Sequence, residues 1–570
     1  MMRPDNRASR TKITGSMITR PLLRLWSSFS AAGLLLGTVL FAMSLTPSLV
    51  PRPFMLQVVV SGVALAAGYG VGVGVRWVWD FMELPHLPER VGWFVKLVLA
   101  IISLGIAVVF LANTAEWQNS VRSLMGMEAI DGARPLRTGL LAFVLFMLII
   151  AVARLFGFMA RRFSRLLHRF VPRRVAIVMG VTGALVVFWL LAEGVAWRWV
   201  LNTFDASFQQ LDALVEPDQA PPEVPGHVGG ALSLLGWNDL GRQGRRFVSE
   251  VTTRAELEEF FSTDEVAEPT RVYVGLNSAA TIDERVELAL AEMVRVGAFE
   301  RDVLVVVTPT GTGWVDPGAM RSVEYLHRGD VASVAIQYSY LPSWLTLLTR
   351  PEYGAETARQ LFDAVYRHWS EMEEGARPRL YLHGLSLGAL NSDRSVDLWD
   401  IVSEPIQGAV WSGPPFRSET WQWATRNRNP GSLAWRPQFR DGSVIRFATQ
   451  GSPAVGFDED WGALRIVYLQ YASDPITFFD LQSFYREPDW MRAPRGPDVS
   501  DSLRWVPIVT FMQLATDIVA ADTAPIGYGH SYAAEHYIDA WRAVSDPQGW
   551  DEHEVERLKA HIGDLRSRKP

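Results

Sequence analysis

The chain has 570 residues, contains no cysteine and carries a formal net charge of −7 at pH 7. The lack of cysteine excludes disulfides, thiolate metal sites and a cysteine nucleophile, and the acidic balance argues against nucleic acid as a partner. Hydrophobic residues make up 49% of the sequence and concentrate in its N-terminal part. This distribution predicts a membrane domain followed by a more polar domain.

Five apolar stretches in the N-terminal part predict membrane-spanning helices. They lie within residues 25–51, 53–75 and 97–115, after Arg137, and within 175–199. The first three contain no charged residue, and each is long enough to cross about 30 Å of hydrocarbon at about 1.5 Å per residue. Glu193 lies near the end of the fifth stretch, beside tryptophans that predict the membrane interface. Five glycines of the second stretch suit close helix packing: Gly62, Gly68, Gly70, Gly72 and Gly74.

Basic residues predict the orientation of these spans. Arginine and lysine are frequent before residue 25 and again within 161–174, between the fourth and fifth spans. Short basic segments stay on the cytoplasmic side, so five spans place everything after residue 200 outside the cytoplasm. The expected location is therefore the inner (cytoplasmic) membrane, with a multi-pass anchor in the lipid bilayer and an extracytoplasmic C-terminal domain.

The expected organisation has four parts. They are a basic cytoplasmic N-terminus (1–24), a transmembrane helical domain (25–203), a connector (204–270) and a catalytic domain (271–570). Residues 215–225 of the connector are proline-rich, which predicts extended chain. The basic segment 240–247 is expected to dock either on the catalytic domain or on the membrane surface.

Alternating apolar and amphipathic segments predict the fold of the catalytic domain. Buried strands are expected near 271–275, 303–308, 333–338, 379–383, 408–412, 444–449 and 465–471. Helical periodicity with charges on one face covers 280–296 and 355–372. Strands that alternate with helices indicate an α/β domain, with a mainly parallel sheet and helices on both faces, behind an all-α transmembrane bundle.

A Gly-x-Ser-x-Gly motif, Gly384–Gly388, ends the apolar run that begins at Arg379. It lies between an expected strand and an expected helix, the context in which this motif forms a strained turn that exposes the serine hydroxyl. Ser386 is therefore a candidate nucleophile. An ordinary strand-to-helix turn without chemistry is the alternative interpretation.

A serine nucleophile needs a base and a carboxylate that orients the base, and enzymes with this motif carry them downstream, the acid before the histidine. Asp474 follows an apolar, strand-like run, and Pro475 stops further strand pairing. His530 lies in a glycine-bracketed loop. We therefore expect Ser386, His530 and Asp474 to act as nucleophile, general base and orienting acid. The alternatives that remain open are His536 for the base and Asp458, Asp460, Asp480 or Asp522 for the acid.

The loop after the β-branched run 302–307 predicts part of an oxyanion hole. Its glycines, Gly311 and Gly313, permit close approach of the backbone to a ligand, although a simple tight turn is the alternative for each. The N–H of Leu387, the residue after the candidate nucleophile, is expected to be the first donor. The second is expected from Gly311 or Thr312.

Three tryptophans are candidates for substrate binding. Trp314 ends the predicted oxyanion loop, and Trp421 and Trp423 lie in the segment 417–440, which is rich in Trp, Arg and Asn and stands where a lid would be inserted. The alternative is that the three tryptophans of this segment, Trp421, Trp423 and Trp435, simply pack or lie at the membrane interface.

Several motifs together carry a family resemblance. They are Pro309–Trp314, Gly384–Gly388, Trp411–Phe416 and Tyr471–Pro475, together with Ser44–Arg52 near the N-terminus. This set resembles the bacterial membrane-anchored α/β-hydrolase family, and the similarity covers nearly the whole chain. The resemblance implies an N-terminal multi-spanning domain and a C-terminal α/β-hydrolase domain with a serine triad. It does not imply a particular substrate.

The expected function is that of a membrane-anchored serine hydrolase, a lipase-like esterase or acyltransferase acting on lipid or cell-envelope esters. No cofactor and no metal are expected, because the sequence shows neither metal-ligand spacing nor a nucleotide-binding motif. The alternative is a non-catalytic membrane protein whose hydrolase-like domain binds a lipid or a partner. Ester, thioester or amide cleavage, hydrolysis or transfer, and the oligomeric state are left open.

Overall fold

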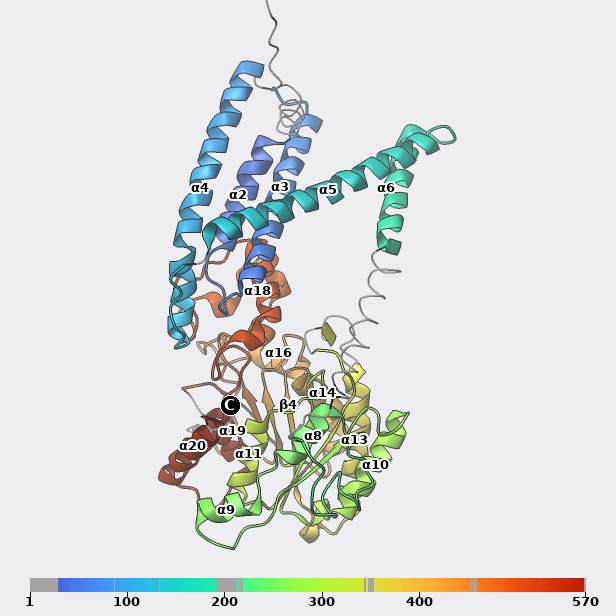
Figure 1. Cartoon of the computed structure of the whole chain (residues 1–570), viewed down its shortest axis with the longest axis vertical. Coiled ribbons are helices and arrows are strands. Elements are labelled where there is room, and N and C mark those ends of the chain that lie inside the picture. Colours follow the sequence, from blue (N-terminus) through green and yellow to red (C-terminus); the bar gives the residue numbers. More distant parts are fainter. Residues whose placement is uncertain are drawn as a thin grey trace, which may run out of the picture. The chain divides into compact units, whose positions relative to one another are not determined.

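The computed structural model describes residues 29–86, 88–132, 134–191, 212, 214, 219–342, 345–346, 353–451, 454 and 459–567 (Figure 1). The chain forms two compact units. The first comprises Met1–Thr46, Pro53–Trp117 and Ile130–Leu155, and the second comprises Pro47–Arg52, Gln118–Ala129 and Phe156–Pro570. The expected N-terminus 1–24 and the end of the fifth expected span, with Glu193, lie outside the described residues.

Five helices follow one another in the N-terminal part: α2 (Ala31–Ser44), α3 (Phe54–Phe81), α4 (Glu89–Leu124), α5 (Pro135–Leu167) and α6 (Arg173–Trp189). Three of them, α3, α4 and α5, are long and apolar enough to cross a membrane. In the most apolar windows of α4 and α5, only 6% and 11% of the residues are buried, which leaves an apolar surface suited to lipid. With 14 and 17 described residues, α2 and α6 are shorter than the roughly 20 residues of a full span. Among the described residues, three of the five expected spans are therefore candidates.

Glycines of α3 permit close helix packing within the first unit. A Cβ on Gly68 or Gly72 would lie 2.5 Å from the backbone of α2, and one on Gly62 would lie 2.8 Å from a leucine of α5. Gly70 and Gly74 face open space. The packing role expected for the five glycines therefore applies to three of them.

Seven parallel strands form the sheet of the second unit. They are β1 (Thr270–Val274), β2 (Val303–Thr308), β3 (Val331–Ile336), β4 (Arg379–Leu385), β5 (Gly408–Ser412), β6 (Ile445–Ala448) and β7 (Arg465–Leu469). Their order across the sheet is β1-β3-β2-β4-β5-β7-β6, and every neighbouring pair is parallel. All residues of β2 and β3 are buried, as expected for strands covered on both faces. The predicted strands and their parallel arrangement are confirmed.

Helices cover both faces of this sheet. On β5, the indole N–H of Trp411 donates to Ser392 Oγ of α14 (Leu387–Ser395) at 3.0 Å, whereas the hydroxyl of Ser412 is hydrogen-bonded to Tyr537 of α19 (Ala534–Ser545) at 2.7 Å. Successive strand residues point to opposite faces, so these two helices lie on opposite sides. The helices α10 (Ile282–Arg295) and α13 (Tyr353–Glu371) join α14, and α11 (Pro317–Leu326) and α20 (Glu552–Ser567) pack with α19.

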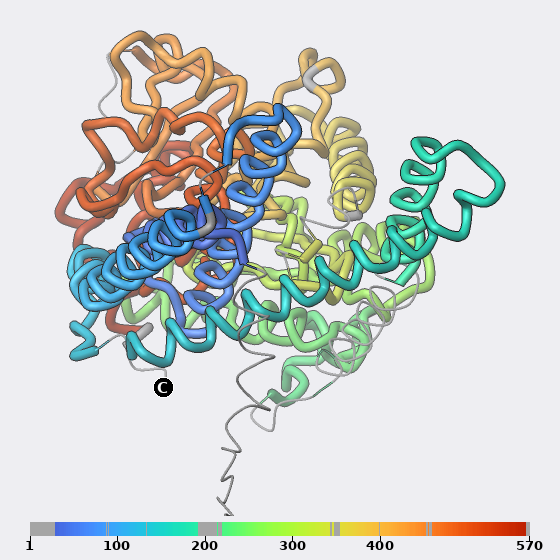
Figure 2. The backbone as a smooth tube through the Cα atoms, turned by 90° about the horizontal axis from the view of Figure 1, so that it is seen from above, coloured from blue at the N-terminus to red at the C-terminus, as the bar shows by residue number. Residues whose placement is uncertain are grey.

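Part of the predicted connector folds onto the sheet. Residues 241–249 form α8 (Gly241–Ser249), which packs on β1 and buries Phe247 in the core of the hydrolase unit. The guanidinium of Arg271 lies 5.1 Å from the centre of that phenyl ring. The remaining described elements are α9 (Arg254–Phe261), η2 (Ala298–Glu300), η3 (Glu374–Ala376), α15 (Leu398–Ile401), α16 (Glu419–Arg426), α17 (Pro475–Phe478), η4 (Leu481–Phe484), η5 (Asp489–Met491), α18 (Val509–Val519) and η6 (Ala521–Thr523). Figure 2 traces the backbone of the chain, coloured along the sequence.

Candidate active site

Ser386 lies at the turn between β4 and α14, with φ 57° and ψ −125°. A serine rarely adopts a positive φ, so this turn is strained. A Cβ on Gly384 would lie 2.5 Å from the backbone of Gly388, and a Cβ on Gly388 would clash with the carbonyl oxygen of Thr308 on β2. The backbone therefore packs too closely at both motif positions for any residue except glycine, and the motif forms the expected strand–turn–helix.

Asp474 and His530 meet beyond the carboxyl end of β7. Asp474 is the N-cap of α17, where its Oδ1 accepts the N–H of Ile476 at 2.8 Å and of Thr477 at 3.3 Å. Its Oδ2 accepts the Nδ1–H of His530 at 2.8 Å and the hydroxyl of Tyr532 at 2.7 Å. Both members of the pair are buried. The carboxylate is thus held by several donors and fixes the orientation of the imidazole.

His530 is positioned by packing as well as by charge. Its ring lies against Gly413, at the end of β5, where a Cβ would be 2.6 Å from Cε1. Burial lowers the pKa of His530, but the charge and hydrogen bond of Asp474 and the charge of Asp522 outweigh burial, so the net pKa lies above its ordinary value. With Nδ1 donating to the carboxylate, Nε2 of the neutral ring is the proton acceptor. This Nε2 is buried and has no hydrogen-bond partner among the described residues.

Ser386 and His530 line the same pocket, which has a volume of about 470 Å³. No hydrogen bond joins Ser386 Oγ to His530 Nε2, although both residues are among those described. The pocket is lined by polar side chains, which include Asp316 and Asp522, and by apolar ones, which include Trp314, Pro342, Leu385, Ile476, Ile518 and Ile526. Its chemistry suits a substrate with one reacting polar group and an apolar part.

The loop after β2 borders this pocket. Thr310, Thr312 and Trp314 line it, whereas Gly311 is not among the lining residues. The N–H of Leu387 lies in the first turn of α14, next to Ser386. N–H groups in the first turn of a helix have no partner within the helix and favour negative charge. Of the predicted oxyanion donors, Thr312 lines the pocket and Leu387 directly follows Ser386.

Comparison with known protein families agrees with this architecture. The family described as Alpha/beta-hydrolase family matches residues 270–558, and the region described as Alpha/beta-hydrolase family N-terminus matches residues 45–251. The chain belongs to the α/β-hydrolase family. Searches of curated proteins and of solved structures found no match. The family resemblance is confirmed at this level, and membership supports hydrolase activity in general.

The other candidates for base and acid in this α/β-hydrolase occupy different places. His536, on α19, bonds through Nδ1 to a tyrosine hydroxyl at 2.6 Å and is not among the residues that line the pocket. Asp480 caps η4, and Asp460 is exposed. Asp522 is exposed and lines the pocket, while Asp458 lies outside the described residues. Of the four candidate acids that the structure describes, Asp474 is the one bonded to His530.

The three tryptophans predicted to bind substrate do not line the same cavity. Trp314 lines the pocket of Ser386, whereas Trp421 lines a second cavity of about 520 Å³ and donates its indole N–H to Gln470 at 2.7 Å. Trp423 is 48% exposed and lines neither cavity. The two residues lie two positions apart on α16, so they point in different directions around the helix.

Three residues of the site carry no signal in the sequence. Gln243, on α8, lines the pocket, and its buried Oε1 has no hydrogen-bond partner among the described residues. Tyr273 donates its hydroxyl to the carbonyl of Gly313 at 2.7 Å, and Gln337 donates to the carbonyl of Thr312 at 3.3 Å. These two residues hold the predicted oxyanion loop from β1 and from the end of β3. No spacing motif reports such contacts, since they arise only when the strands assemble.

A metal site would need several ligands close together. Within the part of the chain that the structure describes, no group of three or more His, Asp or Glu side chains lies close enough together to hold a metal ion.

Proposed function

We propose that this chain is a membrane-anchored serine hydrolase that cleaves or transfers acyl groups of ester substrates. The observation that supports this most directly is the buried Asp474–His530 pair, whose histidine lines the same pocket as Ser386. Ser386 stands at a strained turn, as nucleophiles of this fold do. Strain at a buried, conformationally costly position is itself a sign of function.

The proposed reaction proceeds in two halves. Ser386 Oγ attacks the ester carbonyl carbon while His530 Nε2 takes the hydroxyl proton, and Asp474 stabilises the resulting imidazolium. The imidazolium returns the proton to the leaving alkoxide, which gives an acyl-enzyme. Water, or an alcohol in a transfer reaction, then attacks this acyl group by the same proton route. Nε2 has no partner among the described residues, so the proposed mechanism needs a bond from the Ser386 hydroxyl to Nε2 that forms during the reaction, and such bonds are often formed only with substrate bound.

The oxyanion that forms on the carbonyl oxygen needs donors. We propose the N–H of Leu387 as one, because it lies beside Ser386 at the start of α14. The second comes from the backbone of Gly311 or Thr312, in the loop that Tyr273 and Gln337 hold. Loss of one such donor typically lowers the rate by about 100- to 1,000-fold.

The apolar side of the pocket supports an acyl-bearing substrate, and lipid or cell-envelope esters fit the apolar helices of the N-terminal part. We propose that the chain crosses the inner (cytoplasmic) membrane five times, with the hydrolase unit outside the cytoplasm. The basic segments before residue 25 and within 161–174 support that orientation. No cofactor enters this chemistry.

A second candidate function is binding of a lipid or a partner without catalysis. The specific observation in its favour is the missing hydrogen bond between Ser386 and His530, whose Nε2 is buried without a partner among the described residues. In that case the pocket would hold an acyl chain but leave it intact.

Fluorophosphonate labelling of the full-length protein distinguishes the two. An activated serine should be phosphonylated, and Ser386→Ala should abolish the label. Ser333→Ala is the matched control, because Ser333 is also buried in the sheet and its hydroxyl has no hydrogen-bond partner among the described residues. A folded wild-type protein that stays unlabelled, like Ser386→Ala, would favour the binding function.

A further inference from the structure

Residues Pro47–Arg52 lie between α2 and α3 in the sequence, yet they belong to the compact unit that contains the hydrolase sheet. We name this segment the N-terminal strap. Leu49 is fully buried and is part of the same hydrophobic core as the strands. Val50 and Arg52 are also buried, at 1% and 7% exposure. The strap is therefore packed as a structural part of the hydrolase unit.

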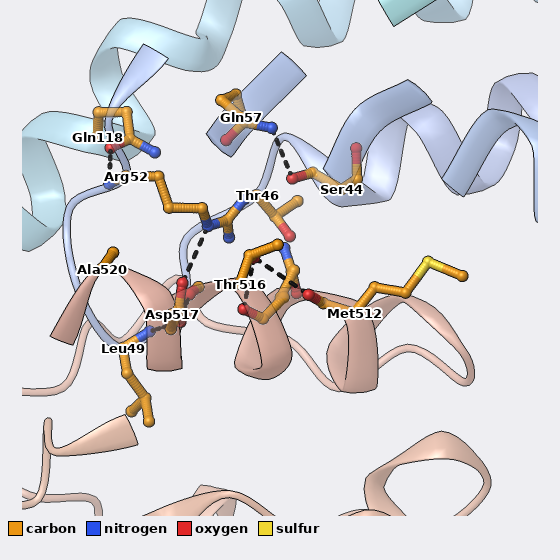
Figure 3. Close-up of polar contacts among 12 residues, drawn as sticks. Ser44, Thr46, Leu49, Arg52, Gln57, Gln118, Met512, Thr516, Asp517 and Ala520 are labelled. Atoms are coloured by element: carbon orange, nitrogen blue, oxygen red, sulfur yellow. Dashed lines mark hydrogen bonds and ion pairs between the residues drawn. The ribbon is translucent and has the colours of Figure 1, made fainter. Parts of the chain in front are cut away.

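Asp517, on α18, accepts hydrogen bonds from several residues of the strap (Figure 3). Arg52 Nε donates to Oδ1 at 3.2 Å, and the N–H of Leu49 donates to Oδ2 at 3.1 Å. The hydroxyl of Ser48 donates to the same Oδ2. The backbone N–H of Arg52 in turn donates to Gln118 Oε1 at 3.1 Å, within the same compact unit. Both ends of the strap are thus tied down.

The ion pair at the centre of these contacts is wholly buried, with both side chains at 0% exposure. Such a pair is weak evidence for stability, because apolar side chains of similar volume are often as stable. The same unit has a comparable pair in Arg271 and Glu324, each 1% exposed, between β1 and α11. The two pairs differ in their surroundings, since only the strap pair adjoins the pocket of the candidate nucleophile.

The residues after Asp517 form a wall of that pocket. Ile518 and Val519 line it, and so does Ala521 at the start of η6. The carbonyl oxygen of Ala521 also accepts the backbone N–H of His530 at 3.4 Å. A shift of α18 would therefore move the apolar wall and the support of the base together.

The strap also contacts the histidine loop directly. Gly529, the residue before His530, has φ 58°, and a Cβ on it would lie 3.3 Å from Cγ1 of Val50. The N–H of Gly529 donates to Ser473 Oγ at 2.9 Å, beside Asp474. Val50 thus closes the space behind the residue that leads into the base.

We propose that the N-terminal strap is a positioning element of the active site. Through Arg52 and Asp517 it holds the α18 wall, and through Val50 it supports the loop of His530. The inference rests on the proposed hydrolase function. Neither Arg52 nor Asp517 is among the residues that line the pocket, so both act through the wall. Esters with long acyl chains, which reach that wall, should depend on the strap more than short ones.

Three variants of the full-length protein test this. Arg52→Met combined with Asp517→Leu removes the pair without leaving an unpaired buried charge. Arg52→Lys keeps the charge but loses the planar guanidinium, so its loss of activity should be smaller than that of the double variant. Val50→Ala removes the contact with Gly529 and leaves the ion pair intact. The matched control is Arg271→Met combined with Glu324→Leu, which removes a buried pair away from the pocket.

The measurement is kcat/KM for p-nitrophenyl acetate and p-nitrophenyl decanoate. The strap double variant should slow both esters, because both need His530, and it should lose about 10- to 100-fold with decanoate, which also reaches the α18 wall, so the loss with decanoate should exceed the loss with acetate. The control pair should change both esters by the same factor. Equal losses on both esters in the strap double variant, or no loss in any strap variant, would overturn the proposal.

A second readout does not depend on activity. Hydrogen–deuterium exchange over residues 518–530 should be faster in the strap double variant than in the wild type and unchanged in the control pair; unchanged exchange in both would overturn the proposal. If the wild type neither labels nor cleaves esters, the hydrolase function fails and the exchange data alone decide the role of the strap. If the double variant does not fold, Val50→Ala decides by both readouts.

Discussion

The substitution Asp474→Asn tests the orientation of the base while leaving the local fold in place. Asparagine is as good an N-cap as aspartate, so its amide oxygen can still accept the N–H groups of Ile476 and Thr477, as Oδ1 does now. The other end of the side chain changes, because an NH₂ group replaces the oxygen that accepts from His530 and Tyr532. The variant is therefore expected to fold.

The catalytic cost follows from the tautomer. The NH₂ group of the substituted side chain donates, so Nδ1 of His530 must become an acceptor, and its proton moves to Nε2. That is the atom that has to accept the Ser386 proton. Loss of the correct tautomer in a serine triad lowers kcat by about 10⁴-fold, which corresponds to about 5 kcal/mol at about 1.4 kcal/mol per tenfold. The bond lost is short, at 2.8 Å, and both partners are buried.

The assay is hydrolysis of p-nitrophenyl acetate together with the thermal unfolding curve. Asp498→Asn is the matched control, because Asp498 is buried and accepts the N–H and hydroxyl of Ser473 without contacting the histidine. It should stay within about tenfold of the wild type, since it removes a supporting bond only. If Asp474→Asn unfolds normally and also retains activity within about tenfold, the assignment of Asp474 as the orienting acid is refuted.

Three further outcomes are expected. The net pKa of His530 lies above its ordinary value of about 6.5, and only the neutral ring accepts a proton. The pH–rate profile of kcat/KM should therefore rise with pH through a midpoint above that value. A lower midpoint would contradict the assignment of His530 as the general base. Gly388→Ala, whose Cβ would clash with the sheet backbone, should abolish fluorophosphonate labelling, whereas Gly375→Ala, in open space, should not; equal labelling would show that the turn tolerates a side chain. A reporter that is active only outside the cytoplasm, fused to the C-terminus, should be active in cells, and silence would rule out the proposed five-span orientation.

The strands of the hydrolase unit could be predicted because both faces of the sheet are covered. Burial on both faces requires continuous β-branched runs, and these stand out between amphipathic helices, as in 303–308. The expected strand 333–338 lies two residues too far along, since β3 runs from Val331 to Ile336. Gln337 follows the last residue of β3, and its side chain donates to the carbonyl of Thr312 in the predicted oxyanion loop.

The candidate site could be predicted where each residue has a local signal. Ser386 lies in a motif, and Asp474 stands where a strand ends before a proline. In a parallel sheet such strand ends gather at one edge, which is why residues far apart in sequence meet. Which of Trp421 and Trp423 lines a cavity, and whether Gln243 lines the pocket, depend on which side of each helix faces the sheet. Composition and residue spacing do not determine that orientation.

Two buried carboxylates of the hydrolase unit, Asp474 and Asp517, show which contacts the sequence can predict and which it cannot. Asp474 accepts hydrogen bonds from Ile476 and Thr477, which follow it directly in the chain. A short stretch of sequence was therefore enough to predict its position at the end of a strand. Asp517 lies in an apolar helix, where an acid must find a partner or stay uncharged. That partner, Arg52, is 465 positions away, in a segment that the sequence assigns to the turn between two membrane spans. A catalytic domain that begins at residue 271 would therefore leave Asp517 without its cation. The strap therefore belongs to the unit proposed to perform the chemistry, although the first strand of the sheet begins more than 200 residues later in the sequence.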